Sequence, residues 1–359
     1  MSLLGEVRVE RAYYHCRRCR AGHCPGDARL RLGDGALTAG AREAASLAGA
    51  LGSFAEAAGK VLPKLAGLRL AESTVERAAE AAGADVGARL RRGETFGPAE
   101  PWAWPADANG GSCAYISVDA TGVGMQGEGG AKAEGRMAYV GLIFAPGAGE
   151  GAGGARAGRA RVAAGLEGLA DLGERMRRQA GQVGIDGARR WVALTDGGAG
   201  LEGFIGVYFP RSECILDFYH AAEHLNGLAK ALRPGDEEAA KALASSWCHA
   251  LKHHGPAAAL AALRGLDLRG RKREIKEAHR LLIGYIERNE HRMDYPRYQR
   301  EGLLIGSGHV EAACKAVVGQ RMKGNGMRWG EAGADAICHL RALFKSEKGQ
   351  WDAYWAVAA

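Results

Sequence analysis

The stretch Cys113-Ala-Tyr-Ile-Ser-Val-Asp119 indicates the fold class, because an apolar run typical of a β-strand ends there on a carboxylate. Trp191-Val-Ala-Leu-Thr-Asp196 repeats the pattern further along the chain. A carboxylate at the carboxyl end of a strand projects from a rigid platform into the crevice beyond the sheet. If the two strands are neighbours, we expect the carboxylates of Asp119 and Asp196 to converge.

The segments around these strands alternate between strand and helix patterns. Strand patterns cover residues 137–144, 161–164 and 214–216, and helix patterns cover residues 166–183 and most of 221–290. Because the strands do not alternate regularly with helices, this order predicts a mixed α/β fold and not a doubly wound repeat.

A third acid, Glu311, follows Ile305-Gly-Ser-Gly308 in the first turn of a predicted helix, with Ser307 as its N-cap. The helix dipole favours the ionised carboxylate there. Glu311 lies at the edge of the apolar face, from which it could lean over the sheet toward the two aspartates. Three converging carboxylates suit Mg²⁺ or Mn²⁺, and two such ions can activate a water or a 3′-hydroxyl against a phosphodiester.

The overall charge is basic, with a formal net charge of +7 over 359 residues. A basic balance favours a polyanionic partner, although a mildly basic enzyme without one fits equally well. Neither a run of roughly eighteen apolar residues nor a secretory signal is found, which predicts a cytosolic protein. The eight cysteines are then expected to be thiols or metal ligands.

Residues 1–37 contain a cysteine cluster. Two thiolates spaced as in Cys16-Arg-Arg-Cys19 can hold zinc from one turn, and His23 and Cys24 could complete a set of four ligands, with His15 as the alternative histidine. No second, well-separated pair follows, so the segment is interpreted either as a partial zinc ribbon or as a basic loop without metal.

Residues 38–95 carry three helix patterns, with a short glycine turn at residues 66–69. Ser73 and Glu76 form a predicted capping box at the start of the third helix. Helix, turn and capped helix are typical of a helix-turn-helix, which would place Arg77 in the first turns of a recognition helix. A plain helical hairpin packed on the core is the alternative. Residues 96–111, rich in proline, glycine and tryptophan, predict a linker.

Near the C-terminus, Arg321-Met-Lys-Gly-Asn-Gly-Met-Arg-Trp329 is basic and includes an aromatic residue. These are the features of a loop that contacts phosphates and bases. We therefore predict DNA contacts from Arg321, Lys323, Arg328 and Trp329, in addition to Arg77.

Motifs that agree with one known family occur in order along most of the chain. They are Tyr13-Tyr-His-Cys-Arg-Arg-Cys19, Ser73-Thr-Val75, Val118-Asp-Ala-Thr-Gly122, Asp196-Gly-Gly-Ala199, Ile215-Leu-Asp-Phe-Tyr-His-Ala-Ala-Glu-His-Leu225, Asn289-Glu-His-Arg-Met-Asp-Tyr-Pro-Arg-Tyr298, Ile305-Gly-Ser-Gly-His-Val-Glu-Ala-Ala-Cys-Lys315 and Gly326-Met-Arg-Trp329. In this combination the sequence resembles bacterial insertion-sequence transposases of the Mutator-like DDE group.

The resemblance implies a ribonuclease H-like core whose catalytic triad is Asp119, Asp196 and Glu311, holding Mg²⁺ or Mn²⁺. It also implies that Asp217 and His220 support the active site. The implied protein is an enzyme, a DNA transposase of the bacterial cytoplasm and nucleoid. It would cleave transposon ends and join them to target DNA, and it would bind double-stranded DNA as a homo-oligomer.

On this basis the chain divides into six parts. They are the cysteine cluster (1–37), the helix-turn-helix DNA-binding region (38–95), a linker (96–111), the first part of the ribonuclease H-like core (112–220), an all-α insertion (221–300), and the core helix with Glu311 followed by a basic C-terminal region (301–359).

Two other functions stay open. One is a catalytically inactive, transposase-derived DNA-binding protein. Two features suggest this inactive protein. The region before the cysteine cluster is short, and the chain has Gly198-Ala-Gly-Leu201 where family members usually carry an aromatic residue. The other is a ribonuclease H-like nuclease, which would cut nucleic acid without joining strands.

Overall fold

A five-stranded mixed sheet forms the centre of the molecule, in a computed structural model that describes residues 1–30, 37–147, 157–198 and 200–358. Ala199 of the second acidic motif lies outside these residues. The strand order is β5-β4-β3-β6-β7. The strands are β3 (Cys113–Val123), β4 (Arg136–Pro146), β5 (Ala157–Gly165), β6 (Arg190–Thr195) and β7 (Ser212–Leu216). The predicted mixed α/β class is confirmed.

The pairing of β3 changes along its length. β3 pairs antiparallel with β4 on one side and parallel with β6 on the other, and the parallel ladder ends at Ser117 and Leu194. The antiparallel ladder continues to Val123. The prediction that Asp119 ends its strand is therefore wrong, because β4 supplies backbone partners beyond Ser117. Asp119 still lies just past the parallel ladder, at the sheet edge where β6 ends next to Asp196.

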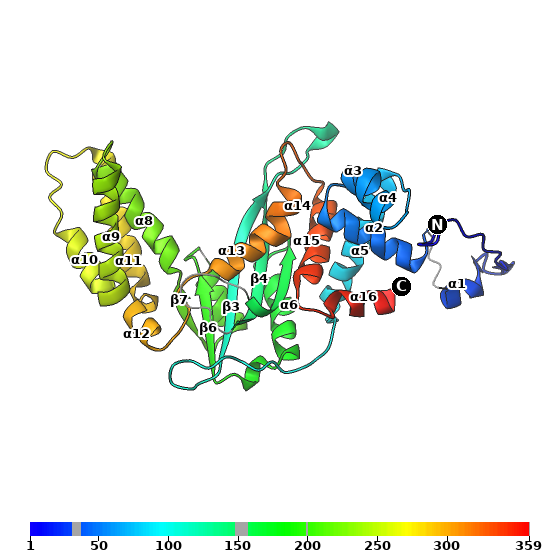
Figure 1. Ribbon diagram of the computed structural model, residues 1–359, viewed down its shortest axis with the longest axis horizontal. Helices are drawn as coiled ribbons and strands as arrows, with labels where there is room; N and C mark the ends of the chain where they lie inside the picture. Colours follow the sequence, from blue (N-terminus) through cyan, green and yellow to red (C-terminus); the bar gives the residue numbers. More distant parts are fainter. Residues whose placement is uncertain (31–36, 148–156, 199, 359) are drawn as a thin grey trace.

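Helices cover both faces of the sheet. Because alternate side chains of β3 point to opposite sides, each face of the strand packs in its own cluster. Ala114, Ile116 and Val118 pack in one cluster with α6 (Leu169–Gln182) and α7 (Leu201–Tyr208). The opposite face packs in another cluster with α5 (Glu72–Arg91), α13 (Gly308–Cys314) and α15 (Glu331–Lys345). Figure 1 shows α13 crossing the sheet near β3 and β4.

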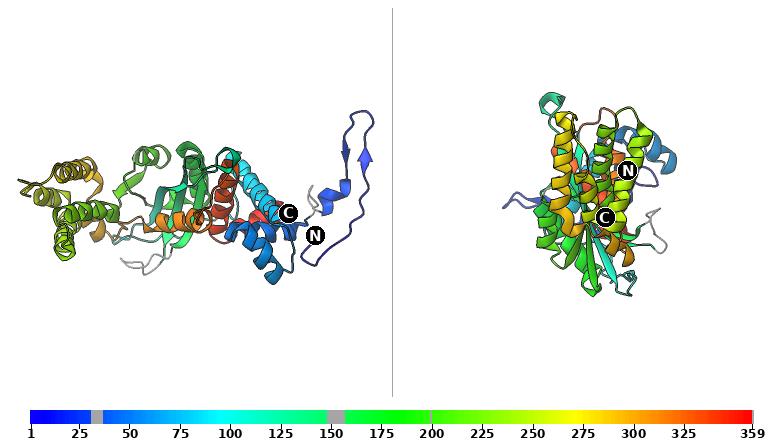
Figure 2. Two further views of the ribbon diagram at one scale, coloured as in Figure 1. Left: turned by 90° about the horizontal axis from the view of Figure 1, so that it is seen from above. Right: turned by 90° about the vertical axis from the view of Figure 1, so that its left-hand side faces the viewer.

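The predicted helical segment after Asp217 is confirmed as helical. It contains α8 (Phe218–Leu232), α9 (Glu237–His254), α10 (Pro256–Arg264), α11 (Arg273–Asn289), the 3₁₀ turn η4 (Glu290–Arg292) and α12 (Tyr295–Arg300). These helices form one end of an elongated molecule, beyond β7, and the N-terminal helices lie at the opposite end (Figure 1, Figure 2).

The N-terminal helices are α2 (Ala39–Leu51), α3 (Phe54–Glu56), the π-helical turn η1 (Ala57–Val61), α4 (Leu62–Leu65) and α5. The predicted capping box is wrong. Ala71 is the N-cap of α5, and its carbonyl accepts hydrogen bonds from the amides of Thr74 and Val75. Ser73 therefore lies inside the first helical turn, because the chain is already helical at Glu72.

Small residues let α5 pack very closely on α15. A Cβ added to Gly83 would lie 2.0 Å from the carbonyl oxygen of Ala336, and one added to Gly87 would lie 2.5 Å from Cδ2 of His339. The ring of Phe96, which follows α5, makes an edge contact with Tyr354 at a centroid distance of 5.4 Å. The predicted recognition helix is thus packed against the helices that cover the central sheet.

The remaining elements are short or terminal. They are β1 (Tyr14–His15), β2 (Gly22–His23), α1 (Pro25–Leu30), η2 (Glu128–Gly130), η3 (Ile185–Gly187), η5 (Lys315–Gly319), α14 (Gln320–Met322) and α16 (Gln350–Ala358). Among the described residues, no helix combines the length and the apolar character that a membrane crossing requires.

Candidate active site

An acidic pocket opens at the sheet edge where the parallel ladders end. It has a volume of about 250 Å³, and its lining includes Asp119, Asp196, Asp217, His220 and Glu311. The structure therefore brings together all five residues that the sequence assigned to the catalytic triad and its support. Glu223, Tyr219 and Ser307, which were not assigned, also line the pocket.

Asp119 reaches the pocket from β3 and is half-buried. Its Oδ1 accepts a hydrogen bond from the amide of Ala120 at 2.6 Å, and its Oδ2 lies 3.5 Å from the Cys314 sulfur. Burial raises the pKa of Asp119, and the nearby Asp196 carboxylate raises it further. Burial and the charge of Asp119 raise the pKa of Cys314 as well, which keeps that sulfur a thiol donor toward Asp119. A cation in the pocket would relieve the repulsion between the two aspartates.

Asp196 reaches the pocket from a tight turn after β6. Its Oδ1 accepts a hydrogen bond from the amide of Gly198 at 2.8 Å. Gly197 has a φ of +84°, a conformation that residues with a Cβ rarely adopt, and an added Cβ would lie 2.8 Å from Leu216. The glycine therefore lets the chain turn sharply while the carboxylate stays at the sheet edge.

Asp217 and Glu311 are joined through Ser307. The Ser307 hydroxyl donates to Asp217 and lies 3.1 Å from Oε1 of Glu311. Asp217 is only 1% exposed and caps α8 by accepting from the amide of Tyr219 at 2.7 Å. Ser307 occupies the predicted N-cap position of α13, but its side chain does not cap the helix because its hydroxyl binds these acids. Asp217 thus fixes the start of α13, and with it Glu311, relative to α8.

His220 of α8 lines the pocket, and a second histidine of the same helix, His224, lies beside it. Nε2 of His220 and Nε2 of His224 are 3.3 Å apart, and the ring of His224 lies 4.5 Å from that of Tyr285. Burial and the neighbouring His220 lower the pKa of His224, which favours its neutral form. His224 was not among the site residues predicted from the sequence, although a spacing of four residues on a helix places it on the same face as His220.

Only part of the predicted DNA-contacting set is exposed. Arg77, Lys323 and Arg328 are exposed, whereas Arg321 is 3% exposed and Trp329 is 6% exposed. Lys323 donates to the hydroxyl of Thr121 beside the acidic pocket.

Arg321 and Trp329 are corrected to structural residues. The Arg321 guanidinium donates to the carbonyl of Gly49 at 2.8 Å and packs against the rings of Phe54 and Trp329, 4.5 Å and 4.8 Å from their centroids. The Trp329 indole donates to the carbonyl of Met322. These contacts join the C-terminal loop to the N-terminal helices, so neither side chain is free to reach DNA.

The cysteine cluster lies on the small β1–β2 hairpin, which extends away from the rest of the molecule (Figure 2). Hydrogen bonds from the amide and thiol of Cys19 lower the pKa of Cys16. Within the described residues, however, the ligand atoms of this cluster do not form a group of three within 4.8 Å of one another. The zinc site stays a prediction.

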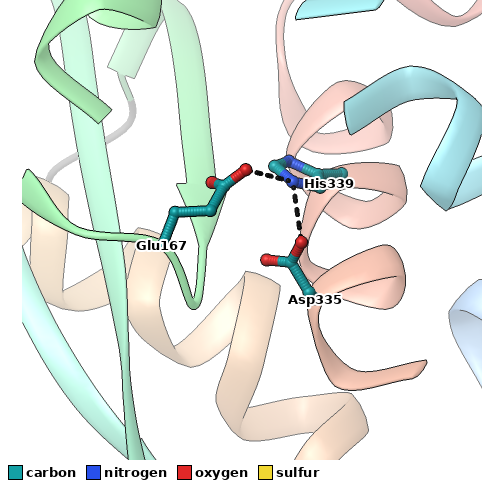
Figure 3. A group of neighbouring side chains, drawn as sticks. All are labelled: Glu167, Asp335 and His339. Atoms are coloured by element: carbon teal, nitrogen blue, oxygen red, sulfur yellow. Dashed lines mark ion pairs between the residues drawn. The ribbon is translucent and has the colours of Figure 1, made fainter. Parts of the chain in front are cut away.

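A different group of side chains has three ligand atoms this close together. Ligand atoms of Glu167, Asp335 and His339 all lie within 4.8 Å of one another (Figure 3). Nε2 of His339 is 3.3 Å from a carboxylate oxygen of each acid. The guanidinium of Arg175 lies 2.7 Å from Glu167, and that of Arg91 lies 2.6 Å from the same carboxylate.

Those arginines determine how the group of Glu167, Asp335 and His339 is interpreted. The three side chains could hold a metal ion by ligand type, but two guanidinium groups already neutralise the carboxylate of Glu167. We interpret it as an ion network that joins α15 to the start of α6. This network was not predicted from the sequence. Its one local signal was the spacing of Asp335 and His339 on one helix face, because Glu167 is remote in the sequence.

No protein-family model matches the sequence, and none of the curated proteins searched matches it.

Proposed function

We propose that the protein is a DDE-type DNA transposase that cleaves transposon ends and joins them to target DNA. The observation that supports this most strongly is the convergence of Asp119, Asp196 and Glu311 in one pocket. The three acids come from β3, the turn after β6 and the first turn of α13, so only the folded chain could bring them together. Their order and their flanking motifs are those of the family that the sequence resembles.

The donor set of the pocket fits Mg²⁺ or Mn²⁺. Carboxylate oxygens are the ligands that these hard cations prefer, and Asp119, Asp196 and Glu311 would supply them. Such ions, when bound, activate a water or 3′-hydroxyl and stabilise the leaving oxygen of a phosphodiester. The protein's own contribution is positional: Ser307 and Asp217 hold the first turn of α13, and the Cys314 thiol orients Asp119.

Other features support the same proposal. The mixed sheet with helices on both faces is compatible with a ribonuclease H-like core. Exposed Arg77, Lys323 and Arg328 could neutralise DNA phosphates. Zinc at the cysteine hairpin, a homo-oligomer on DNA and a nucleoid location are further parts of the proposal.

The proposal can be tested with DNA flanking the gene as a source of candidate ends, incubated with purified protein and Mn²⁺. We expect both nicked and joined products. Asp119→Asn should abolish both, since a metal ligand is lost. The matched control is Asp186→Asn, which removes an exposed carboxylate with 61% of its side chain accessible.

Each outcome has a defined meaning. Undiminished joining by Asp119→Asn would refute the catalytic assignment. Nicks without joined strands would favour a nuclease, and DNA binding without either product would favour the inactive DNA-binding protein.

A further inference from the structure

A pair of histidines one helical turn apart lies at the edge of the acidic pocket. His220 and His224 occupy the first two turns of α8, which runs from the end of β7 into the helical end of the molecule (Figure 1). His220 lines the pocket together with the carboxylates, and its ring centroid lies 4.8 Å from that of His224. The proposed phosphodiester chemistry uses the carboxylates of this pocket and leaves the two imidazoles free for another role.

The Nε2 atoms of the two histidines face each other. They are 3.3 Å apart, which is less than the 4.8 Å between the ring centroids, so both nitrogens point to a common position. Zinc bonds imidazole nitrogen at about 2.0–2.1 Å in tetrahedral geometry, so two nitrogens on one ion are about 3.3–3.4 Å apart. The observed separation is therefore that of two imidazoles sharing one cation, and it is longer than a typical hydrogen bond from an N–H donor to oxygen, about 2.9–3.0 Å.

A tyrosine from a remote helix holds the two rings in place. The ring of Tyr285, on α11, lies 4.5 Å from the ring of His224 and 6.5 Å from that of His220, measured between centroids. Tyr285 is partly buried, so it can fix the positions of both imidazoles by packing on them. Ligands whose rotamers are locked by neighbouring side chains form a preorganised metal site.

Glu223 lies near the other nitrogen of His220. Its Oε2 is 3.8 Å from Nδ1 of His220, and its side chain is 81% exposed and therefore free to adjust. Histidines that bind a metal through one nitrogen almost always donate the other N–H to a carboxylate, a carbonyl or water, which fixes the tautomer and raises the basicity of the ligand. Glu223 thus occupies the place of that carboxylate and leaves Nε2 of His220 for the metal.

The ligand type determines the class of metal. Imidazole nitrogen suits Zn²⁺, Cu²⁺ and Ni²⁺, whereas carboxylate oxygen suits Mg²⁺ and Mn²⁺. The pocket of about 250 Å³ next to the pair has room for water molecules on the other positions of a tetrahedral ion. Because only two ligands come from the protein, such a site exchanges its ion more readily than a closed structural site with four.

We propose that His220 and His224 bind one transition-metal cation of the class of Zn²⁺, at a site separate from the carboxylates that suit Mg²⁺ or Mn²⁺. The Nε2 atom of each histidine supplies one ligand, and water in the pocket supplies the others. The acidic pocket therefore takes two kinds of cation on two sets of ligands. This site does not depend on the proposed function, because it requires neither DNA nor a reaction.

The test is a calorimetric titration of the full chain with Zn²⁺ in the presence of excess Mg²⁺, which keeps the carboxylates occupied. The number of zinc ions bound per chain is compared between the wild type and His224→Ala. We expect the variant to bind about one ion fewer. Zinc bound by the cysteine hairpin contributes equally to both proteins, so the difference reports the histidine pair alone.

Two control variants accompany this titration. His291→Ala removes an imidazole that is 55% exposed and lies 2.7 Å from Glu202, and it should leave the number of zinc ions unchanged. Asp119→Asn should also leave it unchanged, because the carboxylate belongs to the other set of ligands. An unchanged thermal unfolding midpoint without zinc shows that each variant folds, and if His224→Ala does not fold, His224→Gln takes its place.

Each outcome decides the proposal. Loss of one zinc ion in His224→Ala alone among these variants supports the pair as the site. An unchanged number of ions in His224→Ala, or an equal loss in His291→Ala, would overturn the proposal. Loss of the same ion in Asp119→Asn would assign that ion to the carboxylates and overturn the proposal as well.

Discussion

Removal of Glu167 should strongly destabilise the fold, because it is the main acidic partner of a buried cation. The Arg175 side chain is 3% exposed and lies 2.7 Å from the Glu167 carboxylate, which is itself 14% exposed. In Glu167→Ala the Arg175 guanidinium keeps its 3.0 Å contact with Nδ1 of His339 but loses its nearest negative charge. Removing one partner of a buried ion pair costs about 3–5 kcal/mol of unfolding free energy.

Arg91, the second arginine beside Glu167, adds little to the expected loss of unfolding free energy. Arg91 also contacts Glu167, at 2.6 Å, but its side chain is 46% exposed, so its share stays below about 1 kcal/mol. We therefore expect Glu167→Ala to lose about 3–5 kcal/mol in urea unfolding followed by circular dichroism. The control Glu237→Ala removes a carboxylate that is 90% exposed and lies 3.9 Å from Lys241, and it should cost less than about 1 kcal/mol.

The loss should depend on pH. Burial alone raises the pKa of Glu167 and Asp335, but the hydrogen bonds and charge of His339, together with the charge of Arg175, outweigh burial and hold both pKa values below their usual range. A lowered carboxyl pKa stabilises the fold above the unfolded value of about 4, and this stabilisation is lost as the pH falls through the folded value. The difference between wild type and Glu167→Ala should therefore be largest near neutral pH and shrink in acid.

Two results would refute this reasoning. A cost of Glu167→Ala no larger than that of the control would show that Arg175 does not depend on this carboxylate. A fall in the wild-type unfolding midpoint on addition of EDTA, absent in Glu167→Ala, would show that the group binds a metal ion.

The remaining predictions concern α5 and the cysteine hairpin. Gly83→Ala should destabilise the protein by about 1–3 kcal/mol, because its Cβ would lie 2.0 Å from the carbonyl oxygen of Ala336. Gly227→Ala in α8 meets no atom within 4 Å and should stabilise it by up to about 1 kcal/mol; equal effects in thermal unfolding would argue against the tight α5–α15 contact. If the hairpin binds zinc, metal analysis of purified protein should find about one ion per chain, lost in the double variant Cys16→Ser and Cys19→Ser. An unchanged zinc content in that variant would exclude these thiols as ligands.

Local sequence patterns predicted the strands well but not all of their ends. The apolar run before Asp119 was enough to predict β3, since its residues alternate between two buried faces. Its true end depended on β4, which pairs with β3 beyond the last residue that β6 can reach. In the same way, the capping box at Ser73 satisfied a local rule, whereas the helix begins earlier, at Glu72.

Burial separated residues that look alike in the sequence. Arg321, Lys323 and Arg328 lie in one basic loop, and the sequence alone assigned all three to DNA. Arg321 is buried because it contacts Phe54 and the carbonyl of Gly49, which belong to a remote part of the chain. Lys323 and Arg328 are exposed.

The sequence by itself determined the mixed α/β class, the helical segment after Asp217 and the identity of the converging acids. These three features follow from short-range periodicity and from motifs that can be recognised without knowing how the chain packs. Only the tertiary structure decided that Ser307 joins Asp217 to Glu311, that α5 is packed against α15, and that Glu167 meets His339. The physical reason is that each of these contacts joins segments remote in sequence, and a local pattern carries no information about which distant surface will cover it.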